Sequence, residues 1–357
     1  MQFRKFILLI SVSSFLLLIQ SCKPDKTEGP VISVEEELTP YDLKYPLGFP
    51  PFEIPEDNPI TVQGVELGRQ LFYDEKLSGD NTQSCASCHV SKSSFSDPNR
   101  FSTGIDGSIG NRNAMAIVNL GYSFSYFWDG RAATLEEQAL EPINNPVEMN
   151  TNWPDVLVKL NEDSDYRKKF KLAFDADYID SLDVAKAIAQ FERTMISGNS
   201  RLDQYLQKLV SFTASEKRGF DIYTTERADC FHCHGTRLSM GFVYENNGLQ
   251  KTIIDQGRAA VTGNPLDVGK FKPPTLRNIA LTAPYMHDGR FQTLEEVIEF
   301  YNSGINQSSP NVSPLMLKTN RLGGSLNLTD QEKADLLAFL KTLTDTSFVV
   351  NSNFMKP

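Results

Sequence analysis

Two short stretches decide the fold, Cys85-Ala86-Ser87-Cys88-His89 and Cys230-Phe231-His232-Cys233-His234. Each has the Cys-x-x-Cys-His spacing of a c-type haem attachment site. The two thiols can form thioethers with the vinyl groups of one porphyrin, and the histidine that follows can bind the iron. Zinc held by two Cys-x-x-Cys pairs is the competing interpretation, and it leaves the histidine after each pair unexplained. The sequence therefore predicts two covalently bound haems c, held by Cys85, Cys88 and His89 and by Cys230, Cys233 and His234.

The bulk composition is that of an acidic globular protein. The chain has 357 residues, a formal net charge of −10 and 40% hydrophobic residues, with a pI of about 5.0. The length favours about two domains, and the hydrophobic content is enough for a sizeable core. A negative charge argues against a nucleic-acid partner.

The first residues have the pattern of an export signal. Arg4 and Lys5 precede an apolar run, Phe6 to Ile19, that is short for a membrane span. Ser21-Cys22 follows and resembles a bacterial lipoprotein cleavage site, although an ordinary secretory signal with a chance cysteine is the alternative. We therefore expect a signal peptide over residues 1–21, a polar tether over 22–45, and a periplasmic protein whose only membrane attachment is a lipid on Cys22.

The rest of the chain reads mainly as helices. Apolar residues recur at helical spacing in several segments, and strand signals are few. Ser215 begins a capping-box-like pattern in which Arg218 stands where the acid is expected. The predicted helices are Val65–Tyr73, Thr134–Leu140, Trp153–Leu160, Tyr166–Phe174, Leu182–Met195, Ser215–Tyr223, Thr293–Tyr301 and Thr329–Leu343.

An internal repeat follows the two haem motifs. Two nine-residue segments are identical at seven positions and differ only at the two after the arginine: Asp129–Glu137 (DGRAATLEE) and Asp288–Glu296 (DGRFQTLEE). An Arg-Asn pair precedes each segment, at Arg112-Asn113 and at Arg277-Asn278. Gene duplication of a haem domain explains the match. We expect a mainly α protein of two cytochrome c-like haem domains, an N-terminal domain over 46–198 and a C-terminal domain over 199–357.

The ligand on the second face of each iron decides its chemistry. A strong ligand there gives electron transfer, whereas an open face allows reaction with a small oxidant. Only four histidines exist, and two of them follow the cysteine motifs; His232, inside the second motif, is expected to point away from the iron. Counting from the repeated Arg, Tyr301 corresponds to Pro142, so one haem can be capped by a phenolate while the other stays open. Packing in the core is the alternative for Tyr301. Met286 and Met149 are weaker ligand candidates, and packing beside the haem is the alternative for them.

The chain from about Val62 to Thr344 resembles the bacterial di-haem cytochrome c peroxidases and their relatives of the MauG type. The resemblance is carried by the two haem motifs together with Arg112-Asn113, Phe127–Arg131, Gln138, Val147–Asn150, Pro274–Asn278 and Ala283–Gly289.

The resemblance implies roles for individual residues. The haem on Cys85 is then the peroxidatic centre, with Glu148 as acid/base, Gln138 beside it and Trp128 as the indole that relays electrons between the haems. The haem on Cys230 is then the electron-receiving centre. A calcium ion between the domains is implied at Asn113, Thr282 and Pro284.

Two departures from the peroxidase pattern bear on the activity. The peroxidases carry a distal histidine in the loop that matches Gly104–Asn113, and this loop has none. The enzyme is therefore expected to react without reductive activation. The peroxidases also have methionine where this chain has Tyr301, and tyrosine is the MauG-like choice. His287 is left as a structural or propionate-binding residue.

Three functions remain open from the sequence. The first is an oxidoreductase that reduces H₂O₂ to water at the Cys85 haem, with electrons from a small cytochrome c or cupredoxin. The second is a MauG-like enzyme that oxidises a protein or organic substrate with peroxide. The third is a non-catalytic electron carrier with two six-coordinate haems, against which the scarcity of histidine argues. Neither the donor nor a homodimer is decided by the sequence.

Overall fold

The computed structural model describes residues 37–235, 237–238, 240–317 and 325–357, and residues 38–357 form one compact unit. The predicted signal peptide, Cys22 and most of the predicted tether lie outside the described residues. The longer helices are α1 (Val62–Phe72), α3 (Leu135–Asn144), α4 (Trp153–Glu162), α5 (Ser164–Phe174), α6 (Ser181–Thr194), α7 (Arg201–Leu206), α8 (Ala214–Tyr223), α11 (Leu294–Glu299) and α13 (Asp330–Lys341). The short ones are α2 (Cys85–Cys88), α9 (Phe231–His234), α10 (Ala259–Thr262) and α14 (Thr346–Val349), with 3₁₀ turns Glu75–Leu77, Ser91–Ser93, Leu120–Tyr122, Pro265–Asp267, Ile279–Leu281 and Ser352–Phe354.

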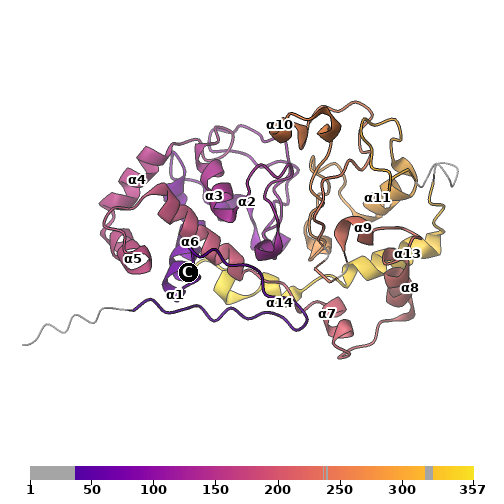
Figure 1. Cartoon of the computed structure of the whole chain (residues 1–357), viewed down its shortest axis with the longest axis horizontal. Helices are drawn as coiled ribbons and strands as arrows, with labels where there is room; N and C mark the ends of the chain where they lie inside the picture. The colour runs from indigo at the N-terminus through magenta and orange to yellow at the C-terminus, as the bar shows by residue number, and fades with distance from the viewer. Residues whose placement is uncertain (1–36, 236, 239, 318–324) are drawn as a thin grey trace, which may run out of the picture. The chain divides into compact units, whose positions relative to one another are not determined.

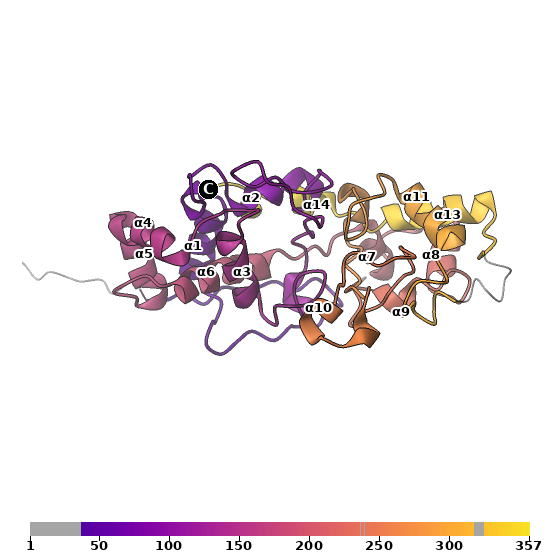
Figure 2. The same ribbon diagram turned by 90° about the horizontal axis from the view of Figure 1, so that it is seen from above.

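The mainly α fold class is confirmed. Over the described residues, extended pairing is limited to isolated bridges such as Tyr126 with Ala132 and Tyr285 with Phe291. Helices α1 and α3 to α6 gather on one side of the unit, and α8, α9, α11 and α13 on the other, as Figures 1 and 2 show from two directions. Each group encloses a hydrophobic core of its own.

In the first half, α1 crosses α6 at a glycine. A Cβ on Gly68 would lie 1.8 Å from the Ala187 carbonyl oxygen and 3.0 Å from the Phe191 Cβ. Only a residue without a side chain allows the two backbones to come this close. Phe72 of α1 and Phe191 of α6 lie in one core cluster, and Cys85 of the first haem motif packs against that cluster.

The second half contains the same crossing between α8 and α13. A Cβ on Gly219 would lie 1.9 Å from the Asp335 carbonyl oxygen and 2.8 Å from the Phe339 Cβ, which are again four residues apart on the partner helix. Asn119 and Asn278 also match, because each has a left-handed conformation and begins a 3₁₀ turn. By backbone conformation, the residue of the first half that is equivalent to Asn278 is therefore Asn119 and not Asn113. These likenesses support the predicted duplication, which stays a prediction together with the division at residues 198 and 199.

The predicted helices are all present, with shifted ends. The clearest difference lies at α8, where Thr213 and not Ser215 is the N-cap: its hydroxyl accepts from the Glu216 N–H, and the Glu216 carboxylate accepts from the Thr213 N–H at 2.7 Å. The predicted helix Thr293–Tyr301 also changes character, because α11 ends at Glu299 and a π-helical turn, Phe300–Gly304, continues it. A π turn rotates the side chains that follow it, and such turns are frequent at functional sites.

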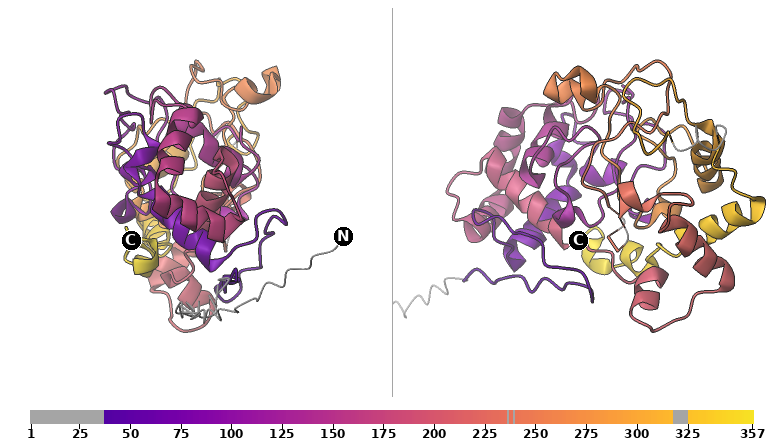
Figure 3. Two further views of the ribbon diagram at one scale, coloured as in Figure 1. Left: turned by 90° about the vertical axis from the view of Figure 1, so that its left-hand side faces the viewer. Right: turned by 45° about the vertical axis from the view of Figure 1, so that its right-hand side comes forward.

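The chain end returns to the first half. Residues 345–357, which we call the C-terminal tail, leave α13 and run back toward α1 (yellow in Figure 1, also visible in Figure 3). Phe348 and Phe354 are buried in a core cluster with Phe72, Phe95 and Phe191. The Tyr73 hydroxyl donates to the Phe354 carbonyl at 2.7 Å. The C-terminal tail thus completes a second core cluster of the first half.

Among the described residues, the helices are all too short or too polar to cross a bilayer.

Candidate active site

A cavity of about 670 Å³ lies between the two halves and is lined by residues of both Cys-x-x-Cys-His motifs. Cys88 and His89 line it from the first motif, and Cys230, Cys233 and His234 from the second. Its size is within the range of cofactor sites in proteins. His232 does not line the cavity, and its Nδ1 pairs with Asp229. Its direction relative to the iron stays a prediction.

The two motif histidines have the orientation that an iron ligand needs. His89 Nδ1 lies 2.9 Å from the Phe95 carbonyl oxygen, and His234 Nδ1 lies 3.1 Å from the Pro274 carbonyl oxygen. A ring that donates through Nδ1 has its lone pair on Nε2, which is the atom left for a metal. Burial lowers the pKa of both imidazoles, that of His234 to about 4, so both are neutral as a ligand must be. The residues present therefore fit two c-type haems.

The predicted acid/base group lies in this cavity on the side of the first motif. Glu148 follows α3 in a tight turn, and its Oε1 accepts from Asn145 Nδ2 at 2.7 Å. Burial raises the pKa of Glu148, while the Asn145 bond and the Arg131 charge act in the opposite direction. Gln138 of α3 lines the same cavity, and so does Asn145, which the sequence analysis missed. A carboxylate with a raised pKa beside a substrate cavity is suited to proton transfer.

The loop without histidine is held against this acid. The Ile105 N–H donates to the Glu148 carbonyl at 3.1 Å, and a Cβ on Gly104 would lie 2.6 Å from the Val147 carbonyl oxygen. Gly110 to Asn113 continue along the cavity wall. Because the chain has no histidine in this loop, no imidazole from it can close the cavity over the first haem.

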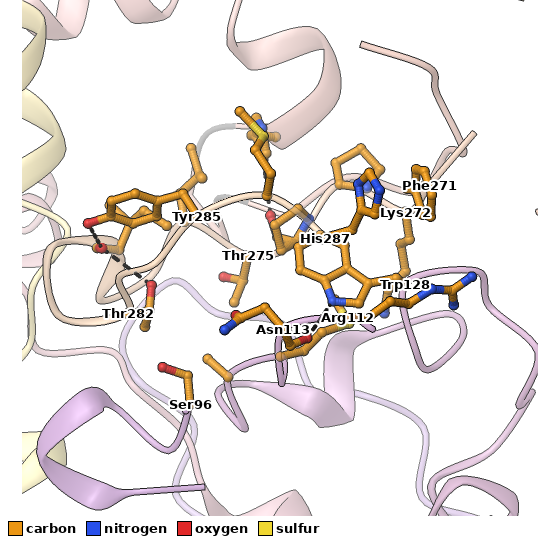
Figure 4. A pocket seen from close by; sticks show the side chains of 18 of the residues that line it. Ser96, Arg112, Asn113, Trp128, Phe271, Lys272, Thr275, Thr282, Tyr285 and His287 are labelled. Carbon is orange, nitrogen blue, oxygen red and sulfur yellow. Dashed lines mark hydrogen bonds between the residues drawn. The ribbon is translucent and has the colours of Figure 1, made fainter. Parts of the chain in front are cut away.

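Trp128 lines the cavity together with residues of both motifs, and its role as a relay stays a prediction. Its indole N–H donates to the Asn113 carbonyl at 2.8 Å. Its ring is 6.4 Å from that of His287 in an edge-on contact, and His287 stacks on Phe271 with 3.8 Å between ring centroids (Figure 4). Trp128 and His287 are the same position of the repeated segment, so the repeat brings two aromatic rings together at its centre. Burial lowers the pKa of His287 to about 4, which makes it a neutral packing partner.

Lys272 is a buried cation beside Trp128 that the sequence analysis also missed. Its backbone N–H donates to the Trp128 carbonyl at 2.7 Å. Its ammonium donates to Ser123 Oγ at 2.9 Å and to the Ser125 carbonyl at 2.5 Å. Burial lowers its pKa to about 8, and no carboxylate of the described residues acts to raise it. A haem propionate in this cavity is an anion that would balance the charge.

Tyr301 enters the cavity from the π turn on the side of the second motif. Its Oη lies 3.2 Å from Asn247 Nδ2, and Met286 Sδ lies 3.6 Å from the same nitrogen. Burial raises the pKa of Tyr301 to about 12. Met149 is different from Met286, because it packs in the first core and does not line the cavity. The structure thus brings Tyr301 and Met286 to the cavity and leaves Met149 as a packing residue.

The three predicted calcium positions, Asn113, Thr282 and Pro284, all line the cavity. The Asn113 amide donates to the Asn99 carbonyl at 3.0 Å, and the Asn113 N–H donates to the His287 carbonyl at 2.8 Å. Thr282 and Pro284 line the cavity, and the Thr282 hydroxyl donates to the Ile279 carbonyl at 3.3 Å (Figure 4). Calcium at these residues stays a prediction.

Comparison with known proteins identifies the family. The sequence pattern described as di-haem cytochrome c peroxidase matches residues 62–211. Cytochrome-c peroxidase IdrP1 of Denitromonas iodatirespirans is 33% identical over 347 residues, which cover 87% of this chain and 90% of that protein. Methylamine utilization protein MauG of Methylophilus methylotrophus is 30% identical over 84% of this chain and 88% of its own length.

A solved structure shows the same fold. A MauG-like protein associated with microbial copper homeostasis is 37% identical and superposes with a TM-score of 0.82, covering 89% of this chain and 99% of that one. The di-haem peroxidase BthA of Burkholderia thailandensis, at 22% identity and a TM-score of 0.68, has the fold in common. The relatives give no support to a non-catalytic carrier. The chain belongs to the di-haem cytochrome c peroxidase and MauG family, oxidoreductases that carry haem c and include the peroxidases that use H₂O₂.

Proposed function

We propose that the protein is a peroxidase that reduces H₂O₂ to water on the side of the Cys85 motif and receives electrons on the side of the Cys230 motif. The observation that carries the proposal is the unequal lining of the cavity. Glu148 and Gln138 lie on the first side, with no imidazole in the loop above them, and Tyr301 and Met286 lie on the second.

The protein groups supply proton transfer and orientation. A bound haem supplies the iron that binds peroxide and exchanges electrons. With a haem bound, Glu148 would take a proton from one oxygen of H₂O₂ and return it to the other oxygen, which would leave as water. Asn145 holds Oε1 of Glu148 by the 2.7 Å bond, so the acid keeps one orientation through both transfers. Two electrons and two further protons complete the reduction to two water molecules.

The electrons reach this side through groups between the motifs. Trp128 is fixed through its N–H to Asn113 and through its carbonyl to the Lys272 N–H. A buried indole held by hydrogen bonds on two sides needs little reorganisation when it gains or loses an electron. A small soluble protein, a cytochrome c or a cupredoxin, is the proposed donor.

The test is the variant Glu148→Gln, which keeps the size of the side chain and removes the acid. The rate of reaction of the ferric enzyme with H₂O₂, measured by stopped flow, is expected to fall by about 10²–10⁴-fold. Glu66→Gln on the exposed face of α1 is the matched control and should react at the original rate. An unchanged rate in Glu148→Gln removes Glu148 from the mechanism.

Tyr301 favours a second candidate, MauG-like oxidation of a protein or organic substrate with peroxide as the oxidant. An oxygen ligand on the second iron stabilises its oxidised states, which suits removal of electrons from a substrate. The MauG-like protein at 37% identity agrees with this choice. Steady-state peroxide consumption with and without a reduced donor separates the two: rapid donor turnover selects the peroxidase, and slow turnover with a modified substrate selects the MauG-like enzyme.

Location and calcium complete the proposal. We propose a periplasmic protein anchored by a lipid on Cys22, because the apolar run from Phe6 to Ile19 and the Ser21-Cys22 pair resemble a lipoprotein signal. Cys22→Ser should release the protein from the membrane fraction. Calcium at Asn113, Thr282 and Pro284 should be detected by elemental analysis of the purified protein, and a chelator should then change the haem spectra.

A further inference from the structure

Asn247 connects the two candidate ligands of the second haem. Its Nδ2 is within hydrogen-bonding distance of Tyr301 Oη at 3.2 Å and of Met286 Sδ at 3.6 Å. All three side chains line the cavity together with His234. They come from three separate segments of the chain, so this convergence is made by the fold.

The orientation of the Asn247 amide is determined by its own backbone neighbours. Its Oδ1 accepts from the Leu249 N–H at 3.2 Å, which leaves Nδ2 as the atom that faces Tyr301 and Met286. The preceding residue anchors the segment, because the buried Asn246 amide donates to Ser309 Oγ at 2.9 Å and to the Pro310 carbonyl at 2.6 Å. The donor therefore has a fixed position and direction.

An amide N–H distinguishes between the two ligands. A phenolate oxygen is a strong acceptor, and a hydrogen bond to a charged acceptor is about twice as strong as a neutral one. A thioether sulfur is only a weak acceptor. The same donor therefore stabilises Tyr301 in the position of a ligand far more than it stabilises Met286.

We propose that Asn247 is a positioning residue that selects oxygen over sulfur as the ligand of the Cys230 haem, by donating a hydrogen bond to Tyr301 and leaving Met286 as a bystander. The inference rests on the proposed assignment of Tyr301 as the ligand. It adds a residue that decides how firmly this ligand is held.

The test is competition between Tyr301 and added imidazole for the ferric Cys230 haem. Asn247→Leu removes the donor, and Asn247→Asp removes it while keeping an acceptor for the Leu249 N–H, so the second variant preserves the loop. Loss of a hydrogen bond to a charged group lowers the equilibrium constant for binding of Tyr301 to the iron by at least about tenfold. The Kd of imidazole, measured by EPR through the low-spin signal of the Cys230 haem, is expected to fall at least about tenfold in both variants.

Two further variants separate the possible failures. Tyr301→Phe should abolish the low-spin signal of the wild-type Cys230 haem; if its spectrum equals that of the wild type, Tyr301 is not the ligand and both the assignment and this inference fail. If Tyr301→Phe changes the spectrum while Asn247→Asp leaves the imidazole Kd unchanged, the ligand stands and the role of Asn247 is overturned. Met286→Leu should leave the Kd within about twofold of the wild-type value, because Met286 is not bound, and a larger change contradicts the proposal.

Discussion

At the scale of single residues, the raised pKa of Glu148 predicts how the reaction depends on pH. The group acts first as a base and must be ionised, so the rate of reaction with H₂O₂ should fall as the pH drops through its pKa. Burial raises this pKa, so the fall should begin at a higher pH than for an exposed glutamate. Stopped-flow rates measured from neutral to acidic pH give this decrease in rate. The decrease should be absent in Glu148→Gln, and a decrease that persists in this variant is caused by another group.

Trp128 makes the second prediction at this scale. Trp128→Phe keeps an aromatic ring and removes the N–H that donates to the Asn113 carbonyl. Donor-driven turnover should fall, because the route between the motifs is interrupted. Reaction of the ferric enzyme with peroxide should keep its rate, since Glu148 and Asn145 are untouched. Equal losses in both assays would show that Trp128 supports the site as a whole and is not a relay.

Some residues of the candidate site are predictable from the sequence, and others are not. Glu148, Gln138, Trp128 and Tyr301 were predicted from motifs, and all four line one cavity. Asn247 was not predicted, because its importance comes from contact with a residue 54 positions away. Lysine and asparagine outside motifs give no signal in one sequence; their position next to a cavity is a product of the fold.

At the scale of helices, the two glycine crossings predict sensitivity to the smallest substitution. Gly68→Ala places a methyl group 1.8 Å from the Ala187 carbonyl oxygen, so α1 must move away from α6. Overpacking of this kind costs about 1–3 kcal/mol of unfolding free energy. Gly219→Ala should have a similar cost at α8 and α13. Gly110→Ala is the control, since its nearest atom would be 3.6 Å away; chemical denaturation that finds all three variants alike contradicts the close crossings.

Helices were predictable in position but less so at their ends. Periodic apolar residues located the longer helices except α7, since burial of one face follows directly from the pattern. The cap of α8 was misplaced because Ser215 and Thr213 both precede the apolar run, and only the Glu216 side chain, bonded back to the Thr213 N–H, decides between them. The π turn Phe300–Gly304 gives no signal either, because the apolar pattern does not distinguish it from a continuing α-helix.

At the scale of the whole molecule, the C-terminal tail connects the end of the chain to the first haem. Phe348 packs edge-on against Phe95 with 5.6 Å between ring centroids, and the Phe95 carbonyl is the group that accepts from His89 Nδ1. Phe348→Ala should therefore cost about 3–5 kcal/mol of unfolding free energy. It should also loosen the orientation of His89, so EPR is expected to show a broadened signal from the Cys85 haem while that from the Cys230 haem stays unchanged.

The matched variant for this prediction is Phe339→Ala in α13. Phe339 is also buried, but it packs on Tyr223 at 5.0 Å, in the core of the other half. It should give a similar loss of stability with the spectral change on the Cys230 haem instead. If Phe348→Ala disturbs both haems alike, or only the Cys230 haem, the tail does not act through Phe95. If Phe348→Ala changes only the Cys85 haem and Phe339→Ala changes only the Cys230 haem, the C-terminal tail supports the orientation of His89. A variant truncated after α13 should then still bind the Cys85 haem, but with His89 poorly oriented.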